Sequence, residues 1–430
     1  MPPVNQLLAP GVSFLSLPDT RFKTAQLTAA LLLPLTEETA AENAIVPYLL
    51  RRCCAAYPDM TALNRRLNEL YGARVYASVA RLGDLRALVI NAGSIDDRFA
   101  LQGEAVVEEC ASLLLSMLFE PALEGGLFRE QDVEQERRCL IEQIEAEINE
   151  KRLYARHRCE QLLCPGAYSV PLYGTAERAR ALTRESVTAA WKRILSTAKI
   201  QWFYQGSGDG AAAAEAVRRR FQELGDRRPA ALATETRFAE PDGLARQTEE
   251  MAVNQSKLVM GLRVGVAEPD GDVNAARLMN ALFGGTPHSL LFRNVREKLS
   301  LCYYCSSSYD RLKGVMLVDS GVEADKAGQA EAEILRQLEL LQRGEFSGED
   351  LESARKAVLN QFLSVGDLQS TQAAWYLGQC AGESFVTPEE AAEQIAAVTK
   401  EEVCRAAQTV RPACVYRLQA AEGGERDANL

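Results

Sequence analysis

Histidine, the residue that most often binds zinc and carries protons near neutral pH, is scarce in this chain of 430 residues. Its two histidines are His157 and His288, and neither has a second histidine at the spacing that two zinc ligands on one helix require. His157 lies in a basic helical stretch, and His288 follows Thr286 and Pro287, which are typical of a helix start. We therefore expect both histidines to be structural.

The cysteines offer a second possible chemistry. The sequence has 11 of them, an odd number scattered through helix-like and strand-like segments, which indicates reduced thiols rather than a disulfide framework. Cys302 and Cys305 form a C-x-x-C pair, a pattern found in redox and metal sites. Their segment, Leu301 to Ser308, is predicted to be a strand, and no second pair lies nearby, so packing is the favoured interpretation. The adjacent Cys53 and Cys54 are also interpreted as packing residues.

The balance of charge limits the class of partner. The net charge of −11 and the sequence pI of about 5.1 argue against binding nucleic acid through its phosphates, and they suit a protein that receives basic peptides. No apolar run is long enough to span a membrane, and the first residues do not form a secretory signal. The sequence therefore predicts a cytoplasmic protein without a nucleic-acid or membrane partner.

The chain contains a long internal repeat. Residues 63–78 read LNRRLNELYGARVYAS and residues 291–306 read LFRNVREKLSLCYYCS, and each predicts an amphipathic helix followed by a strand. The next strands also correspond, and Gly93 pairs with Gly321 at the same offset of 228 residues (291 minus 63). Two similar halves are therefore expected.

The elements that must position any site indicate an α+β fold, because strands joined by short turns are followed by runs of helices. We expect an N-terminal half at 1–224, a linker rich in Pro, Ala, Arg and Thr at 225–247, and a C-terminal half at 248–430. One long helix is predicted from Glu130 to Leu163. The predicted strands include 24–33, 74–79, 85–92, 257–266, 301–307 and 315–320.

These segments resemble a known family. The run MNALFGGTPHSLLFRNVREKLSLCYY, from Met279, is similar to the C-terminal half of the pitrilysin-like zinc peptidases, the inverzincins, which include the mitochondrial processing peptidase and insulin-degrading enzyme. That half carries a Gly-Gly turn, an Arg-Glu pair and Leu-x-Tyr, which here are Gly284, Gly285, Arg296, Glu297, Leu301 and Tyr303. ERRCLIEQIEAEI from Glu136 and YGTAE from Tyr173 resemble the N-terminal half. The resemblance implies two halves, each a mainly antiparallel sheet with helices on one face, which face each other like a clam shell.

The resemblance also locates a zinc site whose ligands this chain lacks. The family signature is H-x-x-E-H, in which two histidines four residues apart lie on one face of a helix and the glutamate acts as general base. Its three functional positions fall here on Val46, Leu49 and Leu50. The third ligand, a glutamate of the later long helix, falls on Gln143, and the nearby Glu142 is turned by about 100° around that helix. Zinc is therefore not expected in this chain.

Two other functional residues of the family are present, Arg296 and Tyr303. The resemblance implies that this pair reaches the zinc site of the other half, where both side chains hydrogen-bond the substrate backbone and stabilise the developing oxyanion. The matching positions of the first half are Asn68 and Val75, so the pair is specific to the second half. The alternative is that Arg296 favours the dipole at a helix C-terminus and Tyr303 packs on a sheet. Tyr304, which faces the opposite side of the strand, is a weaker candidate.

In some members of this family one chain carries zinc and a second, zinc-free chain carries the arginine and tyrosine. This chain resembles the second kind, including a bacterial group with LYGA after the second helix, here Leu70 to Ala73. The sequence therefore predicts a substrate-binding subunit that is inactive alone and cleaves peptides with a zinc-bearing partner of the same family. It also allows a homodimer when the chain is alone. The alternatives are an inert peptide-binding scaffold or chaperone, and a zinc enzyme with unorthodox ligands.

Overall fold

The computed structural model describes residues 4–236, 243–270, 272–382 and 384–420, so residues 237–242 of the expected linker lie outside the described residues. The chain packs as two compact units, each assembled from separate stretches. Unit 1 comprises Met1–Glu145, Val170–Ala233 and Gln369–Glu383. Unit 2 comprises Ala146–Ser169, Thr234–Leu368 and Ser384–Leu430. No helix in the described ranges is long and apolar enough to cross a membrane.

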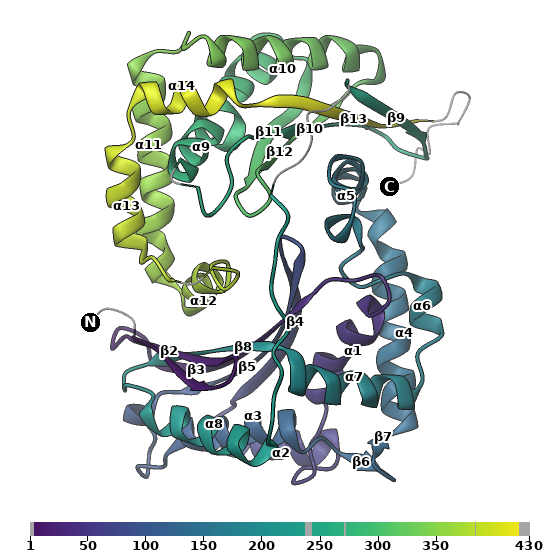
Figure 1. Ribbon diagram of the computed structural model, residues 1–430, viewed down its shortest axis with the longest axis vertical. Helices are drawn as coiled ribbons and strands as arrows, with labels where there is room; N and C mark the ends of the chain where they lie inside the picture. Colours follow the sequence, from purple (N-terminus) through teal and green to yellow (C-terminus); the bar gives the residue numbers. More distant parts are fainter. Residues whose placement is uncertain (1–3, 237–242, 271, 383, 421–430) are drawn as a thin grey trace. The chain divides into compact units, whose positions relative to one another are not determined.

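In the described part of unit 1, six strands form one sheet in the order β1-β2-β8-β3-β5-β4, antiparallel except for the parallel pair β2 and β8 (Figure 1). The strands are β1 (Val4–Ala9), β2 (Val12–Pro18), β3 (Thr24–Pro34), β4 (Arg74–Leu82), β5 (Leu85–Ile95) and β8 (Lys199–Gly206). The helices are α1 (Ala40–Leu50), α2 (Met60–Glu69), α3 (Val106–Phe119), α4 (Glu130–Ala146), α6 (Ala176–Arg180), α7 (Arg184–Thr197), α8 (Ala211–Leu224) and α12 (Gln369–Leu377). A short hairpin joins β6 (Leu123–Glu124) to β7 (Leu127–Phe128).

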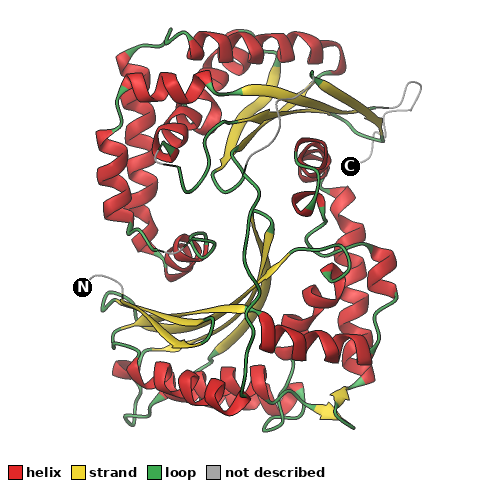
Figure 2. Ribbon diagram, viewed as in Figure 1, coloured by secondary structure: helices red, strands yellow, loops and turns green. Residues whose placement is uncertain are grey.

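In the described part of unit 2, five strands form a sheet in the order β11-β12-β10-β13-β9, antiparallel except for the parallel pair β13 and β9 (labelled in Figure 1). Figure 2 shows the strands in yellow and the helices in red. The strands are β9 (Ala245–Glu250), β10 (Ser256–Arg263), β11 (Cys302–Asp310), β12 (Val315–Val322) and β13 (Arg411–Gln419). The helices are α5 (Lys151–Leu163), α9 (Val273–Asn280), α10 (Ala327–Gln342), α11 (Gly348–Leu363), α13 (Pro388–Ala397) and α14 (Lys400–Gln408), with π-helical turns at Ala281–Gly285 and Phe292–Lys298.

The two sheets share one topology. The order β4-β5-β3-β8-β2 of unit 1 corresponds to β11-β12-β10-β13-β9 of unit 2, and the single parallel pair occupies the same place in both. The predicted α+β fold of two similar halves is therefore confirmed. In each unit, one helix packs on the face of the sheet opposite the other helices: α12 in unit 1 and α5 in unit 2 (Figure 1). In unit 1 the Gln205 side-chain amide donates to the Gln369 backbone carbonyl of α12 at 2.8 Å.

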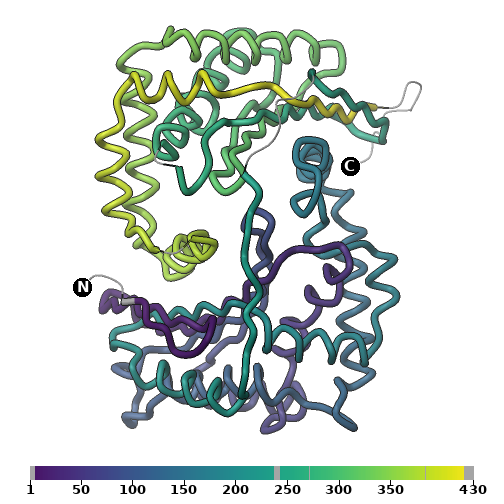
Figure 3. Tube along the Cα trace, viewed as in Figure 1, coloured from purple at the N-terminus to yellow at the C-terminus, as the bar shows by residue number. Residues whose placement is uncertain are grey.

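The predicted helix from Glu130 to Leu163 was wrong as one element. Helix α4 ends at a 3₁₀ turn, Glu147–Asn149, and α5 begins after this turn as a separate helix (Figure 3). The apolar side of α4 packs in the core of unit 1 through Val133 and Leu140. The apolar side of α5 packs on the sheet of unit 2, and its buried residues are Ala155, Cys159 and Leu163. The break occurs where the chain passes from the core of unit 1 to the core of unit 2.

The glycine of the π-helical turn permits close packing against β11. A Cβ atom added to Gly284 would lie 2.7 Å from Ser307 Oγ, 2.8 Å from the Ser307 backbone nitrogen and 2.8 Å from Leu291 Cδ1. Backbone at that distance cannot yield without a shift of the strand. The Gly-Gly turn of the sequence motif therefore sets the distance between this turn and the strand that bears Tyr303.

We predict that Gly284→Ala lowers the free energy of unfolding by about 1–3 kcal/mol, because the added methyl group overpacks a filled interface. Urea unfolding followed by circular dichroism measures the change. Gly328→Ala is the control, since Gly328 lies in the first turn of α10, where an added Cβ atom would have no neighbour within 4 Å, and helix propensity favours alanine by up to about 1 kcal/mol. Equal stability of the two variants would contradict the packing argument.

Candidate functional site

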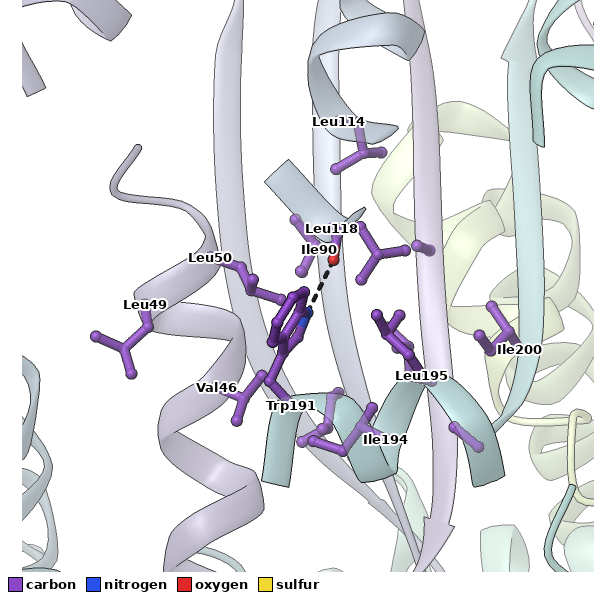
Figure 4. Close-up of a cluster of buried hydrophobic side chains, with 14 of the residues drawn as sticks. Val46, Leu49, Leu50, Ile90, Leu114, Leu118, Trp191, Ile194, Leu195 and Ile200 are labelled. Carbon is purple, nitrogen blue, oxygen red and sulfur yellow. Dashed lines mark hydrogen bonds between the residues drawn. The ribbon is translucent and has the colours of Figure 1, made fainter. Parts of the chain in front are cut away.

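The positions of the zinc signature lie in the hydrophobic core of unit 1. Val46 and Leu50 are each 1% exposed on α1, and they point toward Trp191, whose indole N–H donates to the Leu118 carbonyl at 2.9 Å (Figure 4). Leu49 points to another side of the helix but is only 3% exposed. These side chains offer a metal ion no lone pair, and they fill the space in which ligands would have to converge. Zinc does not fit here.

The position of the third ligand is also unsuited to zinc. Gln143 and Glu142 are both exposed on α4. The acids that α4 does bury are Asp132 and Glu136, and Arg52, two residues beyond α1, pairs with both. Arg52 Nε donates to Asp132 Oδ1 at 3.0 Å, and its Nη1 donates to Glu136 Oε1 at 2.8 Å. An arginine therefore supplies the positive charge between α1 and α4.

The sequence analysis did not predict this ion-pair network. Its signal was the i, i+4 spacing of Asp132 and Glu136, which places two carboxylates on one face of a helix. Arg129 also takes part, because its Nε donates to Asp132 Oδ2 at 2.6 Å. Two arginines thus surround the two buried carboxylates, and the charge that folding buries is paired.

The two histidines do not form a common site. His157 Nδ1 lies 2.6 Å from Glu147 Oε1 in unit 2, and His288 is exposed before the second π-helical turn of the same unit. Across the ranges that the structure describes, no group of three or more His, Cys, Asp or Glu side chains is placed to hold a metal ion.

Arg296 and Tyr303, in contrast, line the same pocket of unit 2. Its volume is about 370 Å³. Tyr303 is 60% exposed, and its hydroxyl donates to Glu323 Oε1 at 3.4 Å. The Arg296 guanidinium lies 4.6 Å from the centre of the Phe292 ring, and the Arg296 side chain is 40% exposed. The lining also includes Glu297, Cys302 and Lys326.

Two backbone irregularities present this pair to the pocket. Arg296 lies in the π-helical turn Phe292–Lys298, a conformation often found at functional sites. The chain then reverses at Ser300, whose φ is 48°, and enters β11. There the register shifts, since Cys302 is opposite Val322 and Tyr304 is opposite Gly321, so Tyr303 is the extra residue of a β-bulge. Bulges redirect side chains, which explains why Tyr303 points to solvent.

Tyr304 has a different environment. It belongs to the face of β11 that α5 covers, and the Arg152 guanidinium lies 4.3 Å from its ring centre. Burial is the main cause that raises the pKa of Tyr304, to about 12. The structure therefore separates the two neighbouring tyrosines, with Tyr303 in the pocket and Tyr304 under a helix.

The pocket contains both signs of charge. The ammonium group of Lys326 lies 3.0 Å from Glu323 Oε2, and this hydrogen bond is the main cause that lowers the pKa of the Glu323 carboxyl. Arg296 Nη1 lies 3.6 Å from Glu297 Oε1. A guanidinium and a phenol can both donate to a peptide carbonyl or carboxylate. The pocket can thus orient a peptide and stabilise negative charge on its oxygen, and its two carboxylates, Glu297 and Glu323, are each within 4 Å of a cation. Its described lining offers no group of three or more side chains that could hold a metal ion.

Comparison with known proteins bears on these findings. A family model described as "Peptidase M16 inactive domain" matches residues 181–358, which include the Gly-Gly turn, Arg296 and Tyr303. A Bacillus subtilis (strain 168) protein named "Probable inactive metalloprotease YmfF" is 28% identical over 404 residues, which cover 94% of each chain. The chain is thus similar to peptidase M16 proteins over nearly its whole length. The predicted resemblance to the pitrilysin-like peptidases, and to their YmfF-like group, is confirmed.

Solved structures similar to this chain span nearly its whole length. The crystal structure of a conserved protein from Enterococcus faecalis V583 has a TM-score of 0.89 and 25% identity, and the match covers 98% of this chain and 100% of that one. The crystal structure of a peptidase M16 inactive domain from Pseudomonas fluorescens has a TM-score of 0.78 at 14% identity, covering 98% and 99%. The two-sheet fold is thus that of M16-like proteins.

We predict that Arg52→Ala lowers the free energy of unfolding by about 2–3 kcal/mol, because it leaves Glu136 buried without its cation. Chemical denaturation at neutral pH measures this change. Adding Glu136→Gln to Arg52→Ala should recover part of the loss. The matched control is Arg51→Ala, since Arg51 is exposed and lies over the Tyr48 ring at 5.6 Å, a contact worth at most about 1 kcal/mol. Equal losses for the two arginines would refute a special role for Arg52.

Proposed function

We propose that this protein is the zinc-free, substrate-binding subunit of a two-chain M16 peptidase, and that it supplies Arg296 and Tyr303 to an active site whose zinc belongs to a partner of the same family. The observation that carries the proposal is their common pocket in unit 2, in a chain whose unit 1 has apolar residues at the zinc positions. The described lining of the pocket has the donors of such a site and no group of side chains that could hold a zinc ion.

The chemistry of the two side chains supports this division of labour. Peptide hydrolysis needs an activated water and donors for the oxyanion that forms when it attacks the carbonyl. Arg296 provides a permanent cation, and Tyr303 provides a neutral O–H on a rigid ring. Both are exposed enough to reach a peptide, and the Tyr303 hydroxyl makes a long 3.4 Å hydrogen bond that a substrate oxygen can replace.

We predict that the purified chain alone does not cleave peptides. We predict that it does cleave them after it is mixed with an M16 chain that has an intact H-x-x-E-H motif and is encoded by a neighbouring gene. Arg296→Ala should lower kcat/KM of the mixture by about 10²–10³-fold, since removal of one oxyanion donor has effects of that size. Tyr303→Phe removes only the hydroxyl and should lower kcat more than it raises KM. Hydrolysis of a quenched fluorescent peptide library rich in Lys and Arg measures both.

Matched controls exist in unit 1. Arg65→Ala removes an exposed arginine of α2, and Tyr76→Phe removes the hydroxyl of an exposed tyrosine of β4, so neither should change the activity of the mixture. Size-exclusion chromatography of each variant with the partner shows whether assembly persists. Full activity with assembled Arg296→Ala protein would refute the role of the pair. Peptide binding by fluorescence anisotropy, without turnover in the mixture, would instead favour an inert peptide-binding scaffold.

A further inference from the structure

The bulge that exposes Tyr303 also changes the relation between Cys302 and Cys305. In a regular strand, residues three apart point to opposite faces. Here the bulge absorbs one residue, so Cys302 is opposite Val322 and Cys305 is opposite Ser320. Val322 and Ser320 are two residues apart on β12, and their side chains share one face. The two cysteines therefore lie on one face of β11, close enough for each thiol to affect the pKa of the other.

The spacing of the two cysteines suits a disulfide. Two residues of a strand span about 6.6 Å, and the register gives Cys302 and Cys305 the spacing of the two β12 residues opposite them. Disulfides join residues whose Cα atoms are about 4.4–6.8 Å apart and whose Cβ atoms are about 3.5–4.5 Å apart, so bond formation must draw the two side chains toward each other. The bulge thus brings this C-x-x-C pair to the upper end of the Cα range. A regular strand would separate the same residues by about 10 Å.

The two thiols differ in exposure and in acidity. Cys302 is half-buried and lines the pocket beside Arg296 and Tyr303, whereas Cys305 is 4% exposed. The hydrogen bond from Cys305 is the main cause that lowers the pKa of the Cys302 thiol, against the opposing effect of burial. The same hydrogen bond, together with burial, raises the pKa of Cys305. This arrangement gives one accessible thiol that ionises more readily than an ordinary cysteine, with a less acidic thiol behind it.

We propose that Cys302 and Cys305 form a reversible redox site in the pocket of unit 2, in which a peroxide oxidises Cys302 and Cys305 resolves the product to a disulfide. The Cys302 thiolate attacks one peroxide oxygen, the O–O bond breaks, and the departing oxygen takes a proton to leave as water or an alcohol. The Cys305 sulfur then attacks the Cys302 sulfenic acid. The S–O bond breaks, and the hydroxyl leaves as water with the Cys305 proton. A dithiol reductant reverses the reaction.

The disulfide would constrain the pocket. Tyr303 lies between the two cysteines in sequence and is the extra residue of the bulge, so a bond between the sulfurs fixes the backbone that presents its ring. Cys302 is itself a lining residue, and the bond would convert its thiol to a disulfide. Oxidation therefore alters the same pocket that holds Arg296.

The experiment uses the full-length, reduced protein exposed to hydrogen peroxide in stoichiometric steps, then alkylated and digested with trypsin. Both cysteines fall on one expected peptide, LSLCYYCSSSYDR at 299–311, which contains no other cysteine. We expect this peptide to lose about 2 Da and to escape alkylation, and to regain both labels after treatment with dithiothreitol. Recovery of the peptide with two alkylated cysteines, at peroxide doses that oxidise the exposed Cys139, would overturn the proposal.

Other thiols of the chain are internal controls. The Cys159 and Cys414 sulfurs are 3.6 Å apart but both residues are buried, so they should stay reduced in the folded protein. Their oxidation in step with Cys302 would attribute the reaction to unfolding and would overturn the proposal. In Cys305→Ser protein, Cys302 should stop at the sulfenic acid and react with dimedone. Since that variant changes a buried residue, the unsubstituted chain provides a second measurement: limited iodoacetamide at neutral pH should label Cys302 several-fold faster than Cys139, and slower labelling of Cys302 would count against the proposal.

Discussion

The register of β11 against β12 is the constraint on which the retained pocket depends. β11 is an edge strand with one pairing partner among the described strands, and the single bulge at its start decides where each side chain goes. Tyr303 is turned to solvent, and Tyr304 faces α5. Without the bulge every residue before Tyr304 would change face, because side chains alternate along a strand. The π-helical turn that holds Arg296 ends just before this point, so the positions of both donors depend on the same few residues.

The positions of the zinc signature in unit 1 contribute to stability instead. Val46 and Leu50 contribute to a core in which burial of each such side chain stabilises the fold by about 1.5–3 kcal/mol. A zinc site needs the opposite, namely polar ligands held around a space that water can enter. The buried carboxylates of α4 would be costly without a cation, and Arg52 provides one. The interface between α1 and α4 is therefore complete without a metal ion.

Much of this fold could be predicted from the sequence, because alternation and repeat length are local signals. The strand predicted at 24–33 is β3 with one more residue, and the strand predicted at 315–320 lies within β12. The break between α4 and α5 could not be predicted, since neither Gly nor Pro marks it and its cause is the packing of two helices in different cores. The bulge at Tyr303 was hidden for a similar reason. Register depends on the partner strand, which the local sequence does not specify, and so the C-x-x-C pair was interpreted as packing.

The composition of the unit 2 pocket is hard to explain by stability. Tyr303 is 60% exposed and makes one long hydrogen bond, and the ion pairs beside it are at the surface, where such pairs contribute between zero and about 1 kcal/mol. The fold would lose little if these side chains were replaced, in contrast to Val46 or Arg52, on which a core and a buried network depend. Yet three backbone irregularities follow one another within a dozen residues and present the Arg296 and Tyr303 side chains. They are a π-helical turn, the left-handed conformation of Ser300 and a β-bulge. Backbone irregularities of this kind are costly and cluster at functional sites, so we infer that a ligand, rather than the fold, accounts for this pocket.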